Sequence, residues 1–64
     1  MTLSLLQVVE LREDWPTGDL SRGTRGTVVD LLDGSGEVYE VEVVGLDGRT
    51  TFLGPLPSAV LRAV

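Results

Sequence analysis

Apolar and charged residues alternate most regularly in residues 39–43, which read Tyr-Glu-Val-Glu-Val. A period of two residues is typical of a β-strand with one buried and one exposed face. We therefore predict a strand here. Tyr39, Val41 and Val43 belong to its core face. Glu40 and Glu42 belong to its outer face.

Four other segments are rich in leucine, valine or threonine and are bounded by turn residues, so each is predicted to form a short strand. Phe52, which lies in one of them, is expected to join Tyr39 in the core. The four predicted strands are residues 5–11, 26–32, 50–53 and 61–64.

Glycine and proline mark the connections between these strands. Residues 33–36 and 46–49 are predicted hairpins, and the Gly-Pro-Leu-Pro segment at 54–57 is predicted to break the sheet. Residues 58–60 suit one short helical turn before the last strand. The whole pattern predicts an all-β fold, a single five-stranded SH3-like barrel spanning residues 1–64.

The register of the second predicted strand stays open on sequence grounds. One interpretation places Thr27, Val29 and Leu31 on the core face. The other introduces a β-bulge, so that Val28 and Leu31 face inward. Asp30 lies outside in both.

The chain has 64 residues, and a domain of this size buries only about 60% of the surface that its unfolded chain exposes. Its core is therefore small, and a homodimer or a partner protein would help to stabilise it. No apolar stretch approaches the roughly 20 residues that span a bilayer, and the N-terminus has no basic signal region. We therefore expect a cytoplasmic protein with no membrane segment.

Cysteine and histidine are both absent. Their absence removes disulfides, thiolate nucleophiles and the commonest base and metal ligand at neutral pH. The serines have no histidine to activate them, and so small a domain is not expected to form a deep pocket. The acidic segment at 33–37 also lacks the ligand spacing of an EF-hand loop. We expect no enzyme, no cofactor and no metal site.

The net charge is −5, with ten acidic residues against five arginines. Nucleic-acid affinity depends mainly on cations that neutralise phosphates, and anionic membrane surfaces also attract cations. A chain of this charge is therefore expected to avoid both. A larger protein with a basic or apolar docking surface is the expected partner.

Several motifs along the chain carry a family resemblance. They read Leu-x-Val-Val-x-Leu at 6–11, Glu-Asp-x-Pro at 13–16, Leu-x-x-Gly-x-x-Gly-Thr-Val-Val at 20–29, Tyr-Glu-Val-Glu-Val at 39–43 and Asp-Gly-Arg-Thr at 47–50. With these motifs the chain resembles a bacterial family of small proteins known as domain of unknown function 4926. The resemblance implies an SH3-like barrel and brings no catalytic residue, cofactor or substrate.

The polar, turn-rich segment 12–22 is predicted to be a long surface loop, and it contains the single tryptophan. Trp15 joined to Pro16, with Leu20 beside them, suits a rigid anchor for a partner protein. The alternative is that Trp15 covers an open end of the barrel, because the domain has few aromatic residues.

The outer face of the 39–43 strand is predicted to carry a stripe of carboxylates. Glu40 and Glu42 lie on it, and Glu37, Asp30 and Asp33 adjoin it. Such a stripe can meet a basic partner, or it can simply be a solvated face that prevents aggregation. Together with the first loop, it suggests a non-catalytic protein–protein interaction module, for example an accessory subunit or an antitoxin-like partner.

Arg22 and Arg25 flank Gly23 and are candidates for a small anion-binding fork. Residues 23–29 are also similar to the glycine-hydrophobic segment of KOW-type barrels, which often bind RNA. The alternative function is therefore a KOW-like RNA-binding barrel that uses this turn. The other interpretation of the two arginines is a solvated loop with simple surface ion pairs.

Overall fold

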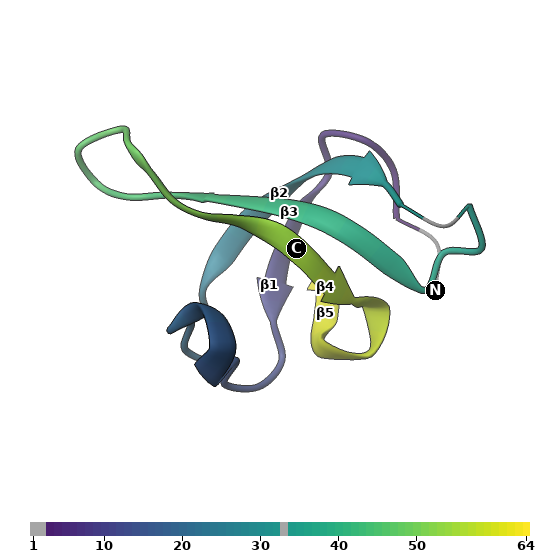
Figure 1. Cartoon of the computed structure of the whole chain (residues 1–64), viewed down its shortest axis with the longest axis horizontal. Coiled ribbons are helices and arrows are strands. Elements are labelled where there is room, and N and C mark those ends of the chain that lie inside the picture. Colours follow the sequence, from purple (N-terminus) through teal and green to yellow (C-terminus); the bar gives the residue numbers. More distant parts are fainter. Residues whose placement is uncertain (1–2, 33) are drawn as a thin grey trace.

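The computed structural model describes residues 3–32 and 34–64. These residues form one antiparallel sheet with the strand order β4-β3-β2-β1-β5 (Figure 1). The five-stranded, all-β prediction is confirmed, and the helical turn lies directly before the last strand. The elements are β1 (Val8–Leu11), η1 (Pro16–Gly18), β2 (Arg25–Leu31), β3 (Val38–Val44), β4 (Thr50–Pro57), η2 (Ser58–Val60) and β5 (Leu61–Ala63), where η denotes a 3₁₀ helix.

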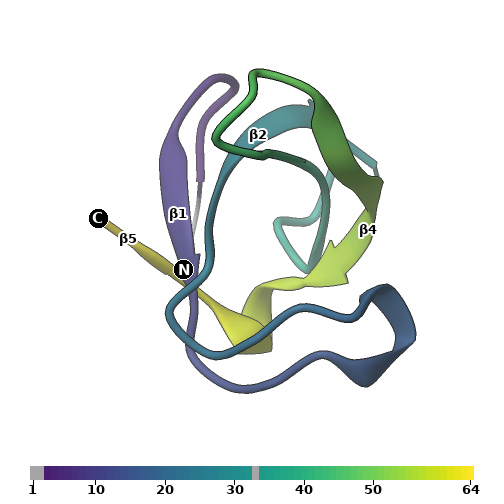
Figure 2. The same ribbon diagram turned by 90° about the vertical axis from the view of Figure 1, so that its left-hand side faces the viewer.

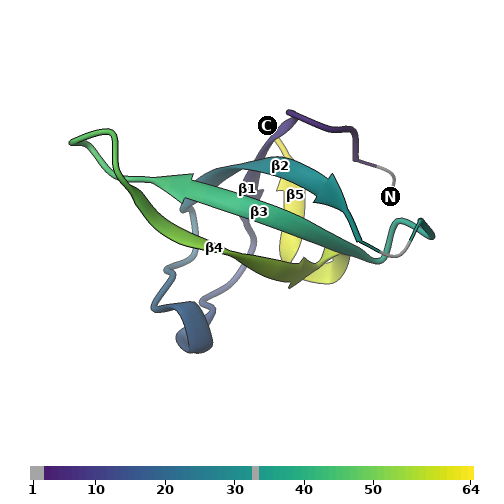
Figure 3. The same ribbon diagram turned by 45° about the horizontal axis from the view of Figure 1, so that its top comes forward.

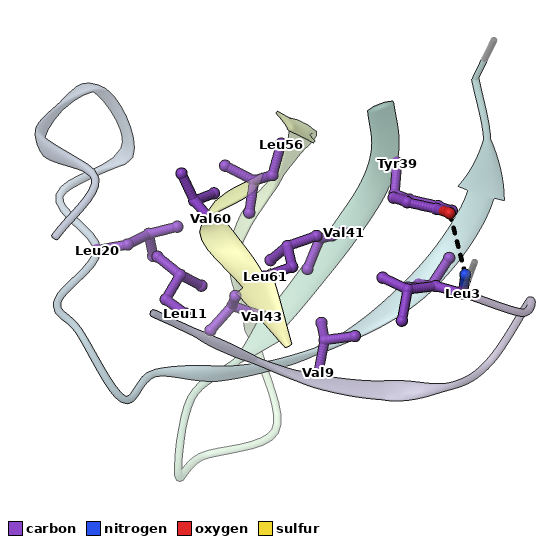
Figure 4. Packing of buried hydrophobic residues seen from close by; sticks show 11 residues of the cluster. Leu3, Val9, Leu11, Leu20, Tyr39, Val41, Val43, Leu56, Val60 and Leu61 are labelled. Atoms are coloured by element: carbon purple, nitrogen blue, oxygen red, sulfur yellow. Dashed lines mark hydrogen bonds between the residues drawn. The ribbon is translucent and has the colours of Figure 1, made fainter. Parts of the chain in front are cut away.

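The sheet curls strongly, so that its inner face encloses the core (Figures 2 and 3). Tyr39 and Val41 are buried as the alternation predicted, and Val43 is buried with them. Phe52 is half-buried and packs against the same cluster. Figure 4 shows this cluster, whose members are Leu3, Val9, Leu11, Leu20, Val28, Tyr39, Val41, Val43, Leu56, Val60 and Leu61.

The first strand is shorter than predicted, because residues 4–7 form a turn. The amide of Gln7 donates to the carbonyl of Ser4 at 3.1 Å, and the amide of Ser4 donates to the Gln7 side chain at 2.9 Å. Such local bonds compete with strand pairing. Leu6 is consequently 75% exposed, whereas Leu3 is buried and its amide donates to the Tyr39 hydroxyl at 3.0 Å.

A β-bulge decides the register of β2. Pairing with β3 shifts between Val28 and Asp30, so that Val28 lies opposite Val41 and Leu31 lies opposite Tyr39. Of the two predicted registers, the bulged one is correct: Val28 is fully buried and Leu31 is on the core side. Leu31 is nevertheless 43% exposed, because β2 ends there. Asp30 is exposed, as both registers predicted.

The predicted break at 54–57 is wrong, because β4 continues through both prolines to Pro57. β4 is an edge strand, which among the described residues pairs with β3 alone. The amide of Ser58 donates to the carbonyl of Glu37 at 2.7 Å. Since backbone groups alternate in direction along a strand, Pro55 and Pro57 turn their nitrogens to the free edge, where no hydrogen bond is lost. Leu56, between them, is fully buried.

Candidate functional site

The first loop folds back on itself at one end of the sheet. Trp15 and Leu20 form a β-bridge, in which each amide donates to the other carbonyl at 2.7 and 3.0 Å. Trp15 is half-buried against the core and Leu20 is 8% exposed, whereas Pro16 is exposed. Gly18 lies so near the Phe52 ring that a Cβ there would come within 2.5 Å of it. The loop therefore covers the core with Trp15 and Leu20.

The carboxylates of the predicted acidic stripe lie on the outer face of the sheet. Glu40 on β3 is paired in register with Asp30 on β2, and Glu42 follows two residues along β3. Glu37 is exposed just before β3. Asp33, the last member of the predicted stripe, lies outside the described residues. Like charges directly opposite each other repel, so this end of the face has an unbalanced negative potential.

Exposed apolar side chains lie beside these carboxylates. The pairing register puts Val8, Thr27, Glu42 and Leu53 in one line across β1, β2, β3 and β4. Val8, Val44 and Leu53 are 45%, 52% and 57% exposed. A shallow groove of about 150 Å³ runs between β1 and β3 here. We call this surface the outer patch, and its residues are Val8, Thr27, Glu42, Val44 and Leu53.

An ion-pair chain occupies the opposite end of the outer face. Glu10 on β1 lies opposite Arg25 on β2 and Arg62 on β5. Nε of Arg62 donates to Oε1 of Glu10 at 2.9 Å, and Nε of Arg25 lies 3.6 Å from Oε2. The carboxylate is thus neutralised here, in contrast to the Asp30–Glu40 end.

The two arginines of the predicted anion fork are directed to different places. Arg25 turns to Glu10 on the sheet, whereas Arg22 lines a cleft with Arg12 and Arg62. Sequence reasoning missed the roles of Arg12 and Arg62. Arg12 and Arg22 are the two ends of the 12–22 loop, ten residues apart, and Arg62 belongs to the last strand, so that only the fold brings the three side chains together.

The structure separates the predicted site residues into two groups. Trp15 and Leu20 cover one end of the core, whereas Glu40 and Glu42 lie on the outer face.

A comparison with protein families matches residues 5–63 to the family described as Domain of unknown function (DUF4926). The chain belongs to this family. Neither the curated proteins nor the solved structures contain a match.

The DUF4926 match extends over all five strands, so the outer patch and the arginine cleft both lie within it. The apolar members of the outer patch were missed by sequence reasoning. The alternation in residues 39–43 marks an outer face, but it does not show which residues of other strands stand beside it. Which residues of the neighbouring strands lie beside Glu40 and Glu42 depends on the pairing register, and the bulge in β2 alters this register.

Hydrogen bonds from Arg62, together with the charges of Arg62 and Arg25, lower the pKa of Glu10 below its ordinary value of 4.5, although burial acts in the opposite direction. A carboxylate whose pKa is lower in the folded state stabilises the fold above its ordinary pKa, and the stabilisation is lost as the pH falls through the folded pKa. We therefore expect Glu10→Gln to lower the free energy of unfolding at neutral pH. Below pH 4.5, the variant should lose less stability with falling pH than the native chain does. Urea unfolding over this pH range measures the effect.

The matched control for this prediction is Glu13→Gln. Glu13 is exposed and forms no ion pair among the residues that the structure describes. The control should follow the pH profile of the native chain. Identical profiles for the two variants would contradict the role assigned to Glu10.

Two further findings apply to residues 3–32 and 34–64 of the DUF4926 chain. No group of three or more acidic, histidine or cysteine side chains is placed to hold a metal ion within these ranges. The same residues contain no helix with the length and apolar character needed to cross a membrane.

Proposed function

We propose that this DUF4926 protein is a non-catalytic protein-interaction module that docks through its outer patch onto a larger protein. The observation that carries the proposal is the combination of exposed Val8, Val44 and Leu53 with carboxylates on one sheet face. Apolar centres with polar rims are typical of protein interfaces. The lack of cysteine and histidine supports the non-catalytic part.

The charge of the outer face favours a partner with basic residues around an apolar surface. Asp30 and Glu40 face each other across β2 and β3, and neither forms an ion pair among the described residues. Glu42 accepts a hydrogen bond from the hydroxyl of Thr50, which is uncharged, and it forms no ion pair among the described residues. A partner's arginine or lysine side chains would relieve the repulsion at this end and would also speed association.

The curvature of the sheet adds a shape requirement to the charge requirement. The outer face is the convex side of the curled sheet (Figure 2). A concave, partly basic surface on a larger protein therefore suits the outer patch better than a flat one. The first loop supports the domain in this proposal, because Trp15 and Leu20 pack against its core.

Two single variants test the docking role by different means. Leu53→Ser removes an exposed apolar side chain, and Glu40→Lys reverses the charge at the acidic end. Proteins captured from a host lysate by the native chain are identified, and the affinity of the purified partner is then measured by calorimetry. Each variant is expected to weaken binding by about tenfold or more, as expected for an interface hot spot.

Leu46→Ser is the matched control for Leu53→Ser. Leu46 is fully exposed at the tip of the β3–β4 hairpin, which extends away from the rest of the sheet (Figure 1). This control should bind the partner as the native chain does. A partner that binds the native chain and both outer-face variants equally well would refute the docking surface.

A further inference from the structure

A second polar surface lies outside the outer patch, where β1 ends. It is a cleft of about 270 Å³ between the end of β1, the turn before β2 and strand β5. Four of its six lining residues are charged. The lining consists of Glu10, Leu11, Arg12, Arg22, Gly23 and Arg62.

Main-chain hydrogen bonds hold the walls of this cleft in place. The amide of Arg12 donates to the carbonyl of Val60 at 2.8 Å, which ties the end of β1 to η2. The amide of Gly23 donates to the carbonyl of Leu11, and the amide of Leu11 donates to the carbonyl of Thr24, both at 2.9 Å. A ligand would therefore meet a cleft whose backbone is already ordered, which lowers the entropic cost of binding.

Two of the three guanidinium groups are not neutralised. Arg62 is bound to Glu10, but Arg12 and Arg22 form no ion pair among the described residues. The carboxylate of Asp14, in the adjoining loop, instead accepts a hydrogen bond from the main-chain amide of Arg22 at 2.8 Å. The side chains that line the cleft are three arginines and Glu10, so they carry an excess of two positive charges, although the chain has a net charge of −5. The carboxylate of Asp14 lies beside this lining and offsets part of the excess.

We propose that this arginine cleft binds a phosphate monoester group. A phosphate monoester carries about −1.5 to −2 charges at neutral pH, opposite in sign to the excess in the cleft. Guanidinium groups bind phosphate oxygens through paired hydrogen bonds, and they stay charged at all physiological pH values. Arg12 and Arg22 supply these bonds, while Glu10 positions Arg62 beside them. This site does not depend on the docking function proposed above.

Titration of the ¹⁵N-labelled protein with inorganic phosphate, followed by NMR, tests the proposal. The expected result is a saturable shift of the amide signals of Arg12, Arg22 and Gly23. The double variant Arg12→Gln/Arg22→Gln should bind phosphate at least about tenfold more weakly, since it loses both unpaired cations. Its amide spectrum shows at the same time that it remains folded.

Arg49→Gln is the matched control. Arg49 is an exposed arginine at the β3–β4 hairpin, and its Nε lies 3.9 Å from a carboxylate oxygen of Asp47. It should bind phosphate as the native chain does. Equal weakening in this control and in the double variant would show unspecific attraction to surface arginines and would overturn the proposal.

Further probes distinguish the sources of the phosphate group. Phosphoserine should compete with inorganic phosphate for the same amides, because both present a phosphate dianion. Phosphoserine binding should weaken below a pH of about 6, where its phosphate group loses its second charge, whereas sulfate binding should not. Shifts that appear only with single-stranded RNA, or no saturable shift with phosphate, would overturn the proposal.

Discussion

Replacing Leu56 by alanine is expected to lower the free energy of unfolding by about 2–5 kcal/mol, the usual cost of cutting a fully buried leucine to alanine. Leu56 is fully buried between two prolines of β4. A 64-residue domain has a total stability of roughly 3–10 kcal/mol, so this one change removes much or all of it. Urea unfolding, followed by the fluorescence of Trp15, measures the loss.

Leu53→Ala is the matched control for Leu56→Ala. Leu53 belongs to the same strand, but it lies on the outer face and is 57% exposed. Its truncation should change the stability by less than about 1 kcal/mol, because little apolar area returns to water. If the two variants were equally stable, the burial of Leu56 in the core would be refuted.

Replacing Gly26 by alanine is expected to cost about 1–3 kcal/mol, the usual range for overpacking a core. A Cβ at this position would lie 2.7 Å from Cγ1 of Val41 and 2.9 Å from the carbonyl oxygen of Glu42. The oxygen belongs to the β3 backbone and cannot move aside without disturbing the sheet. Comparison of thermal and urea unfolding with the native chain measures the cost.

Gly54→Ala provides the comparison for Gly26→Ala. Gly54 is also buried within a strand, but a Cβ there would meet only the ring of Phe52, at 3.2 Å. A half-buried ring can shift by a few tenths of an ångström, whereas backbone cannot. The cost should therefore be smaller than at Gly26, and an equal or larger cost would contradict the close approach of β2 to β3.

The elements that were predicted correctly are those whose local pattern agrees with their place in the fold. Residues 39–43 alternate between apolar and acidic, and β3 buries and exposes them in that order. The turn at η2 and the strand β5 after it were also predicted, because the preceding prolines limit the choices there. In these segments, local conformational preference and burial point to the same structure.

The errors occur where tertiary contacts outweigh local preference. The Gly-Pro-Leu-Pro segment has weak strand propensity, yet it forms the last half of β4, because an edge strand tolerates proline and Leu56 fills the core. The segment before β1 looks like a strand, yet it turns, so that Leu3 reaches Tyr39. Neither outcome can be predicted without knowing which neighbour each segment meets.

For the candidate surfaces too, some features could be predicted from the sequence and others depend on tertiary contacts. By itself, the sequence determined the all-β class, the strand order along the chain, the negative charge and the outward direction of Glu40 and Glu42. The tertiary structure decided which side chains stand together, because only the pairing register sets Leu53 beside Glu42, and only the contacts of β1 with the turn before β2 and with β5 gather Arg12, Arg22 and Arg62. Local patterns depend on neighbouring residues, whereas a binding surface depends on long-range pairing.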